Sequence, residues 1–381
     1  MDALQTELDR LEGNDRYRSA CMKALRYLGD QHDIFPSSFC CRGVVREGKG
    51  SVWGGGFGDI WKGSLSDKPV CLKVLRFFST ETDRERLRKE FFHEALIWRQ
   101  LRHPNILPFL GISDELFAPS LCMISPWMAN GNLIRFLEGN PFHDRFQSIL
   151  EVVEGINYLH DFDPPIVHAD LRGANILVTD DLTCCLADFG LSRIIETQVP
   201  GTSMMLKGSL RWLPPEMMDY SLFKHAHFTA IDIYSLGCTI IEIYSGQLPF
   251  PHIKNDVAMI HEVLTARREH TRPQVFDDDL WSLVMTCLAF EADARPSAGE
   301  LRQSLYALRA ARDASSTADA TGLDNGQTGV SINLISGYQA TTVQTFLLHG
   351  RKVALVIFWI GCVLLSTGSI LYLRIKYLPS A

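Results

Sequence analysis

The sequence lacks the patterns typical of zinc modules, disulfide-rich folds and nucleic-acid-binding proteins. Its ten cysteines are scattered over 381 residues without a Cys-x-x-Cys pair, so neither a zinc site nor a disulfide framework is expected. The net charge of −7 leaves no basic excess, which argues against nucleic acid as the main partner. The length leaves room for one large two-lobed domain with appendages.

The N-terminus also lacks the apolar core of a signal peptide, because residues 1–16 are rich in charged side chains. Between Leu4 and Leu28 the apolar residues fall at helical spacing. This pattern predicts a helical prefix within residues 1–43. We expect the prefix to pack on the domain that follows and to have no role beyond support.

Three polar residues near the middle of the chain suggest phosphoryl transfer. Asp170 and Asn175 precede a short apolar strand at 176–178, and Asp188 follows the next strand across a tight turn. Transfer of a phosphoryl group from ATP needs a carboxylate that orients a hydroxyl group and oxygen ligands for Mg²⁺. The segment resembles the protein kinase catalytic loop, His-x-Asp-Leu-x-x-x-Asn, followed by Asp-Phe-Gly. The alternative is a hairpin whose acidic side chains are merely solvated. This alternative would explain the loop-like segment alone or the Asp-Phe-Gly segment alone, but it explains both at this spacing less well.

A glycine-rich stretch before the first expected helix of the domain fits the same family. Glycines at 54–56 and at Gly58 allow a loop to approach phosphates closely, so that backbone N–H groups can bind oxygens. The stretch resembles the kinase glycine-rich loop, although Trp53 stands where its first glycine belongs. The strand that follows ends in Val-Cys-Leu-Lys at Lys73, similar to the kinase Val-Ala-Ile-Lys.

A carboxylate in an apolar stripe points to a partner for this lysine. Residues 82–102 predict a helix whose apolar stripe contains Phe91 and Trp98, and Glu94 lies in the middle of the stripe. A carboxylate that faces a core needs a cation, because burying it alone costs several kcal/mol. The resemblance names Lys73 as that cation.

The resemblance also implies the site for ATP. The segment after the strand at 121–125 would be the hinge between the lobes, with Ser125 as the gatekeeper. Pro126 and Met128 would offer backbone groups to adenine, and Asn132 would lie near the ribose. The full set of implied ATP contacts is Gly55, Gly56, Gly58, Ile60, Cys71, Lys73, Pro126, Met128, Asn132 and Leu177.

Residues 231–244 are apolar around most of the helical circumference and predict a buried central helix. By resemblance, Asp232 at its start would hold the backbone of the catalytic loop. The resemblance further implies that Arg295 pairs with Glu216, which follows the activation loop.

Beyond residue 310 the composition changes. Residues 311–345 are rich in small and polar residues and predict a flexible linker. Residues 353–373 contain no charged side chain and are long enough to span a bilayer as a helix, with a short tail at 374–381. We therefore expect a tail-anchored membrane protein whose kinase domain faces the cytosol.

The resemblance covers residues 44–310 and is closest to tyrosine-kinase-like Ser/Thr kinases, of the type expanded in mushroom-forming fungi. It implies an α+β, bilobal fold with a five-stranded sheet in the small lobe and a helical large lobe. Lys73 would hold the phosphates of ATP and Glu94 would fix Lys73. Asp170 would accept the proton of the substrate hydroxyl group and Arg172 would stabilise the γ-phosphate. Asn175 and Asp188 would hold Mg²⁺.

Two alternatives remain open from the sequence. Arg172 also occurs at this position in some tyrosine kinases, so tyrosine or dual specificity competes with the favoured phosphorylation of Ser and Thr in protein substrates. Trp53 and Ala169 favour a catalytically dead, membrane-tethered interaction module. Ala169 stands where many kinases carry an arginine that binds a phosphorylated activation loop, so we expect no switch through Thr197, Thr202 or Ser203. Activity would then be set by local concentration at the membrane or, as an alternative to mere support, by the N-terminal helix.

Overall fold

The protein is described by a computed structural model that covers residues 1–11, 16–32, 34–55, 58–75, 81–189, 193–194, 210–222, 228–265, 272–322, 342–348 and 351–357. Residues 1–316 form one compact unit and residues 317–381 form a second. The helices are α1 (Asp2–Arg10), α2 (Arg16–His32), α3 (Glu81–Gln100), α4 (Leu133–Gly139), α5 (Arg145–His160), α7 (Pro215–Met218), α8 (Ala230–Ser245), α9 (Asp256–Thr265), α10 (Asp278–Cys287) and α11 (Ala298–Gly322). The strands are β1 (Val44–Arg46), β2 (Trp53–Gly55), β3 (Gly58–Leu65), β4 (Lys68–Val74), β5 (Gly111–Phe117), β6 (Ser120–Pro126), β7 (Ile166–Val167), β8 (Ile176–Val178), β9 (Cys184–Leu186), β10 (Arg193–Ile194), β11 (Thr342–Leu348) and β12 (Arg351–Ile357).

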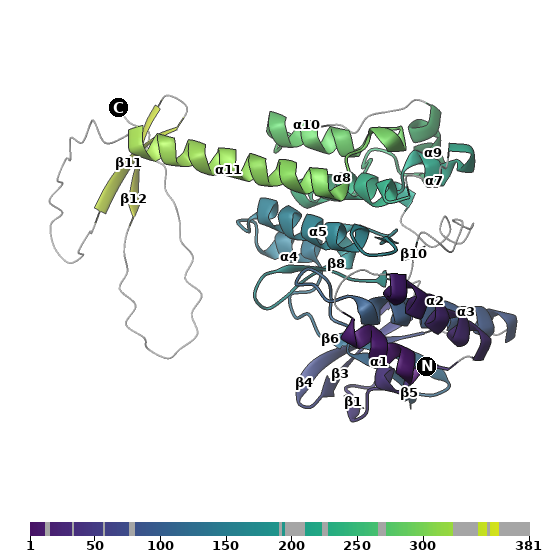
Figure 1. The fold of residues 1–381 in the computed structure, drawn as a ribbon. Coiled ribbons are helices and arrows are strands. Elements are labelled where there is room, and N and C mark those ends of the chain that lie inside the picture. Colours follow the sequence, from purple (N-terminus) through teal and green to yellow (C-terminus); the bar gives the residue numbers. More distant parts are fainter. Residues whose placement is uncertain are drawn as a thin grey trace, which may run out of the picture. The chain divides into compact units, whose positions relative to one another are not determined.

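The small lobe is an antiparallel sheet in the order β1-β3-β4-β6-β5, with β2 also paired to β3 (Figure 1). The sheet thus has six described strands where five were predicted, because two separate segments, β1 and β2, pair with different parts of β3. Gly58 begins β3 at a φ of 150°. A Cβ atom there would lie 2.4 Å from the carbonyl oxygen of Val74, so only glycine fits.

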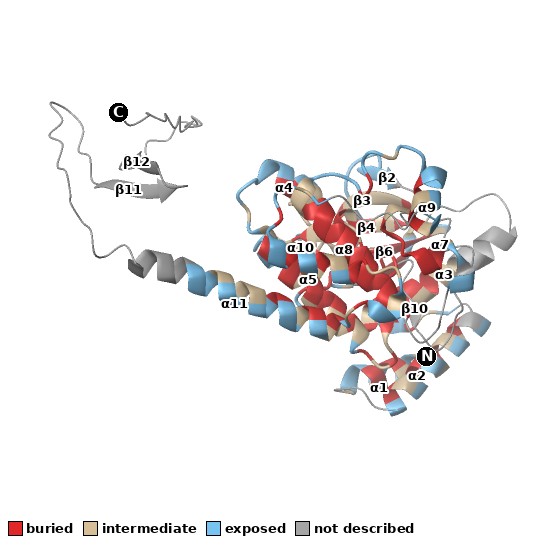
Figure 2. Ribbon diagram, turned by 90° about the horizontal axis from the view of Figure 1, so that it is seen from above, coloured by how far each residue is buried: buried red, intermediate tan, exposed pale blue. Residues whose placement is uncertain are grey.

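The large lobe is helical and is built around α8. Figure 2 shows this helix as buried along most of its length, and it packs against α4, α5 and α10. The prediction of a buried central helix at 231–244 is therefore confirmed. The predicted hairpin that follows the catalytic loop is also present, as the antiparallel pair β8 and β9.

The end of this unit differs from the prediction. The expected boundary at residue 310 falls inside α11, which runs from Ala298 to Gly322, so the predicted linker at 311–345 begins as helix. Residues 311–320 favour a helix because they include four alanines. Arg312 forms an ion pair with Asp277 and lies 4.4 Å from the ring centroid of Phe146, which fixes this part of α11 on the large lobe.

The C-terminal unit contains the antiparallel hairpin of β11 and β12. Residues 353–357 belong to β12 and not to the helix predicted for 353–373, in keeping with three β-branched side chains among these five residues. Residues 358–373 and the tail at 374–381 lie outside the described residues. Within the part of the chain that the structure describes, no helix is long and apolar enough to cross a membrane.

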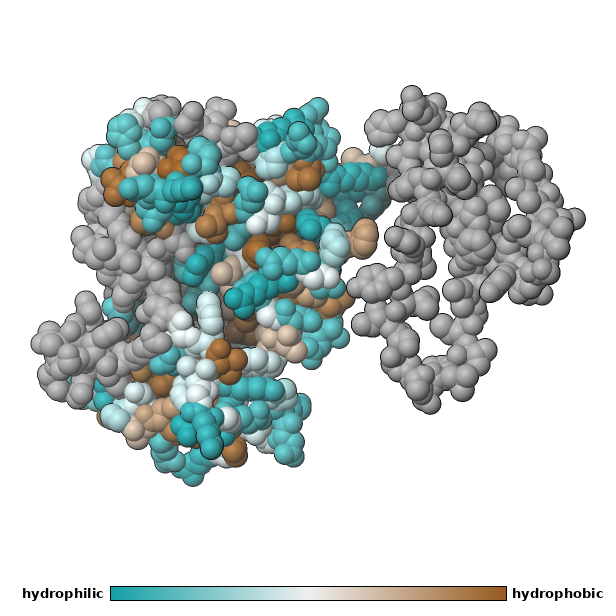
Figure 3. Space-filling view, turned by 180° about the vertical axis from the view of Figure 1, so that it is seen from behind, coloured by the Kyte–Doolittle hydropathy of each residue, from teal (hydrophilic) through white to brown (hydrophobic). Residues whose placement is uncertain are grey.

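The predicted helical prefix is present as α1 and α2, and both helices contribute to the core of the first unit through Leu8 and Leu25. The surface is chemically mixed. Figure 3 shows hydrophilic and hydrophobic residues interspersed over the face opposite to that of Figure 1.

Candidate active site

Three charged side chains from separate elements meet between the lobes. Lys73 on β4 lies with its Nζ 2.7 Å from Oε1 of Glu94 on α3 and 2.7 Å from Oδ1 of Asp188, which follows β9. Burial opposes the charged form of Lys73, but the two carboxylates outweigh it and raise the pKa of the lysine above its usual value. The ammonium group therefore remains charged. The predicted pairing of Lys73 with Glu94 is confirmed.

The catalytic loop forms a second polar group beside this triad. The side-chain amide of Asn175 donates to the backbone carbonyl of Asp170 at 2.9 Å and to its Oδ2 at 2.8 Å. Burial raises the pKa of Asp170; Arg172 lowers it and Asp188 raises it, with a net increase above the usual value. A carboxylate with a raised pKa is a better proton acceptor at neutral pH, provided that it is ionised.

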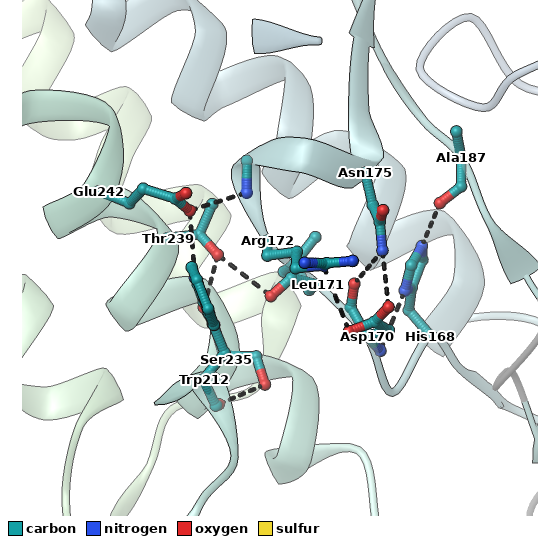
Figure 4. A network of polar contacts seen from close by, with 11 residues as sticks. His168, Asp170, Leu171, Arg172, Asn175, Ala187, Trp212, Ser235, Thr239 and Glu242 are labelled. Carbon is teal, nitrogen blue, oxygen red and sulfur yellow. Dashed lines mark hydrogen bonds and ion pairs between the residues drawn. The ribbon is translucent and has the colours of Figure 1, made fainter. Parts of the chain in front are cut away.

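Arg172 points back toward Asp170 (Figure 4). Its Nε lies 3.6 Å from Oδ1 of Asp170, which is an ion-pair distance but not a hydrogen bond. This Nε is buried and has no hydrogen-bond acceptor among the described residues. A buried donor without an acceptor is costly, so the position suits an anionic ligand.

Asp232 at the start of α8 holds the backbone of the catalytic loop. It is fully buried, and its carboxylate accepts hydrogen bonds from the backbone N–H groups of His168 and Ala169, both at 2.8 Å. Nε2 of His160 lies 2.9 Å from the same carboxylate. Burial raises the pKa of Asp232, but these contacts outweigh it and the net shift is downward. The role predicted for Asp232 is confirmed as a structural contact.

One stripe of α8 carries four polar side chains at intervals of three, four and three residues: Asp232, Ser235, Thr239 and Glu242. Oε2 of Glu242 accepts from the backbone N–H of Gly173 at 2.9 Å and from Nε1 of Trp212 at 3.1 Å. The hydroxyl group of Thr239 donates to the carbonyl of Leu171 at 3.2 Å (Figure 4). The stripe joins the catalytic loop to the segment at 210–212. The sequence interpretation missed Thr239 and Glu242, although their helical spacing from Asp232 was visible.

The described members of the predicted ATP contacts lie on five strands, β2, β3, β4, β6 and β8, and in the segment between β6 and α4. Ile60 on β3 is opposite Lys73, and Cys71 on β4 is opposite Ser125 on β6. Asn132 and Leu177 are brought together by an isolated bridge. The half-buried members of the set are Ile60, Cys71, Pro126, Met128, Asn132 and Leu177. Gly56 lies outside the described residues, whereas Gly55 ends β2 and Gly58 begins β3.

Trp53 and Ala169, the two residues that depart from the kinase pattern, both lie in the described part of the chain. Trp53 on β2 pairs through its backbone with Ile60, and 58% of it is exposed. Ala169 has a φ of 66° and is buried in an apolar cluster with Leu213 and Phe228. The methyl group of Ala169 thus offers no donor for a phosphate. Thr197, Thr202 and Ser203 lie outside the described residues.

The donor set fits a magnesium ion that is shared with a nucleotide. Among the described residues there is no group of three or more His, Cys, Asp or Glu side chains that could hold a metal. Mg²⁺ commonly takes one or two protein ligands and completes its shell with phosphate oxygens and water. Asp188 and Asn175 supply oxygens of this kind, and the backbone N–H of Ala187 donates to the carbonyl of Asn175 at 2.9 Å, which ties the two segments together.

Comparison with known proteins agrees with this geometry. Serine/threonine-protein kinase STY17 from Arabidopsis thaliana is 28% identical over 67% of this chain and 43% of its own length. Mitogen-activated protein kinase kinase kinase 2 from Arabidopsis thaliana is 27% identical over 86% of this chain and 51% of its own length. The chain thus spans about half the length of these relatives or less. Residues 49–305 match the model of the family described as protein tyrosine and serine/threonine kinase, and the chain belongs to that family of protein kinases.

Proposed function

We propose that this protein kinase transfers the γ-phosphoryl group of Mg²⁺-ATP to serine or threonine residues of protein substrates. The observation that supports the proposal best is the meeting of Lys73, Glu94 and Asp188 between the lobes, beside the buried pair of Asp170 and Asn175. STY17, one of the relatives that the chain resembles, is named as a serine/threonine-protein kinase.

In the proposed reaction the hydroxyl oxygen of the substrate attacks the γ-phosphorus. The bond from the γ-phosphorus to the bridging oxygen breaks, ADP leaves, and Asp170 accepts the hydroxyl proton. Lys73 binds the α- and β-phosphates, and the positive charge of Arg172, beside Asp170, opposes the charge on the γ-phosphate. Asn175 and Asp188 hold Mg²⁺, which neutralises phosphate charge when bound.

Phosphoamino-acid analysis tests the proposed function. The full chain is incubated with labelled ATP, Mg²⁺ and a mixture of generic protein substrates, with Asp170→Asn as the control for contaminating kinases. We expect label on serine and threonine that is absent with the variant. Label on tyrosine alone would replace the proposed specificity by the tyrosine alternative, and equal incorporation by both proteins would favour the dead scaffold.

We further propose that the chain is attached to a membrane through residues 353–373, in a helix that would replace the strand pairing of residues 353–357. The support is the sequence, because 21 residues without a charged side chain are long enough to span the hydrocarbon layer. Replacing Val363 and Leu364 by arginine is expected to move the protein into the soluble fraction, since each arginine costs about 2.5–3.5 kcal/mol at a helix centre. Fractionation with alkaline carbonate measures this, and extraction of the unaltered protein by carbonate would contradict membrane insertion.

A further inference from the structure

The outer face of α3 is covered by the two N-terminal helices. Figures 1 and 2 show α2 beside α3, and the two helices pack against each other. Leu8 of α1 and Leu25 of α2 belong to the same buried core as Phe91 and Phe92 of α3. This is the helix that carries Glu94, the residue paired with Lys73. The two N-terminal helices therefore pack on the helix that supplies Glu94 to the active site.

A glycine lies where α2 approaches α3 closely. A Cβ atom at Gly29, in the last turn of α2, would lie 2.0 Å from the ring of Phe92. Other side chains enclose the Phe92 ring, because Phe92 is only 3% exposed and its ring centroid lies 5.0 Å from that of Phe35. The absence of a side chain at Gly29 thus sets how closely α2 approaches α3.

Polar contacts fix the end of α3 against α1. Nε2 of Gln100 donates to Oε1 of Gln5 at 3.0 Å, and both side chains are buried. Nη2 of Arg99 lies 3.1 Å from Oδ2 of Asp9. Buried side-chain amides need hydrogen-bond partners, so this contact fixes the position of α1 along α3.

The prefix also touches the large lobe. The guanidinium of Arg18 on α2 lies 5.1 Å from the ring centroid of Phe162, which follows α5. The same side chain is buried and donates to the carbonyl groups of Leu8 and Leu11. Arg18 therefore contacts α1, lies on α2 and reaches the large lobe. These contacts fix the position of the prefix relative to the large lobe.

We propose that α1 and α2 are a positioning element for phosphoryl transfer, which holds α3 where Glu94 can reach Lys73. Phe92 and Glu94 are two residues apart, so they project from nearly opposite sides of the helix. If α2 pushes on Phe92, α3 is therefore expected to move in the direction of Lys73, and Glu94 moves with it. Glu94 must stay within hydrogen-bond reach of Lys73, and a shift of about 1 Å is enough to cost activity.

The test is Gly29→Ala in the full chain, with Gly139→Ala as the matched control. A Cβ atom at Gly139, the last residue of α4, meets nothing within 4 Å. Alanine favours a helix over glycine, so a loss of activity at position 29 cannot come from a weaker α2. Because the inference rests on the proposed function, the unaltered protein is first required to be active. We expect kcat to fall about tenfold for Gly29→Ala with an unchanged KM for the protein substrate, and the control to match the unaltered protein.

Two further variants separate positioning from a general loss of structure. Gly29→Ala with Phe92→Leu makes room for the new methyl group and is expected to recover most of the lost kcat. Gly29→Ala is expected to add little to Glu94→Gln, because both act through the same ion pair. If Gly29→Ala does not fold, Gln5→Ala, which removes the contact with Gln100, is expected to lower kcat in the same way and to add as little to Glu94→Gln. Unchanged kcat in a folded Gly29→Ala protein, or full additivity with Glu94→Gln, would overturn the positioning role.

Discussion

Lys73→Met and Asp188→Asn are each expected to lower kcat at saturating Mg²⁺-ATP by about 10²–10³-fold. Both side chains lie between the lobes, where the ammonium group contacts the carboxylate at 2.7 Å. In the proposed reaction the ammonium group of Lys73 would oppose phosphate charge, and the carboxylate of Asp188 would help to hold Mg²⁺, which would neutralise phosphate charge as well. Such fixed charges act strongly because the site is shielded from water: only 16% of the Lys73 side chain is exposed.

The matched control for this prediction is Lys62→Met on the neighbouring strand β3. Lys62 is 43% exposed and lies 3.9 Å from Glu47, so its removal is expected to change neither turnover nor the melting temperature appreciably. Initial rates with a generic protein substrate measure the effect, and thermal melting shows whether each variant is folded. Near-normal turnover in either Lys73→Met or Asp188→Asn, in a folded protein, would remove the proposed mechanism.

The ion pair of Lys73 and Glu94 could be predicted because a local rule and a family pattern agreed. A carboxylate within an apolar helical stripe is too costly to leave without a cation, and the family resemblance named Lys73 as that cation. The network on α8 was harder to predict. Thr239 and Glu242 lie in a helix that is apolar on most sides, and their partners in the catalytic loop are backbone groups of Leu171 and Gly173, which no side-chain pattern reveals.

The N-terminal prefix and the C-terminal segment show two other limits. Helical periodicity predicted a helical prefix, which is present as the two helices α1 and α2, but the close approach of Gly29 to Phe92 is a tertiary contact that no sequence periodicity contains. At residues 353–357 the apolar run suits a strand as well as a helix, and pairing with β11 decides between them. Periodicity therefore predicts the type of an element better than its partner.

Arg295→Met is expected to be the most destabilising single change in the large lobe, at about 3–5 kcal/mol. The guanidinium binds Glu216 with two hydrogen bonds, of 2.6 and 2.9 Å, and it also donates to the carbonyl groups of Ala230, Ala289 and Phe290. The Arg295 side chain is fully buried and that of Glu216 is 6% exposed. Methionine would fill much of the space but would leave a buried carboxylate without its cation.

Unfolding in urea measures this effect, with Arg302→Met as the control. Arg302 forms a pair with Glu154 at 2.7 Å, but 43% of its side chain is exposed, so its loss is expected to cost less than about 1 kcal/mol. Adding Glu216→Gln to Arg295→Met removes the stranded charge and is expected to recover part of the stability, since much of the cost comes from that charge. Equal midpoints for Arg295→Met and Arg302→Met would show that the buried pair contributes no more to stability than a surface pair. Because Glu216 follows the segment at 210–212, a weakened pair is also expected to loosen the contact of Trp212 with Glu242, and thereby the support of the catalytic loop.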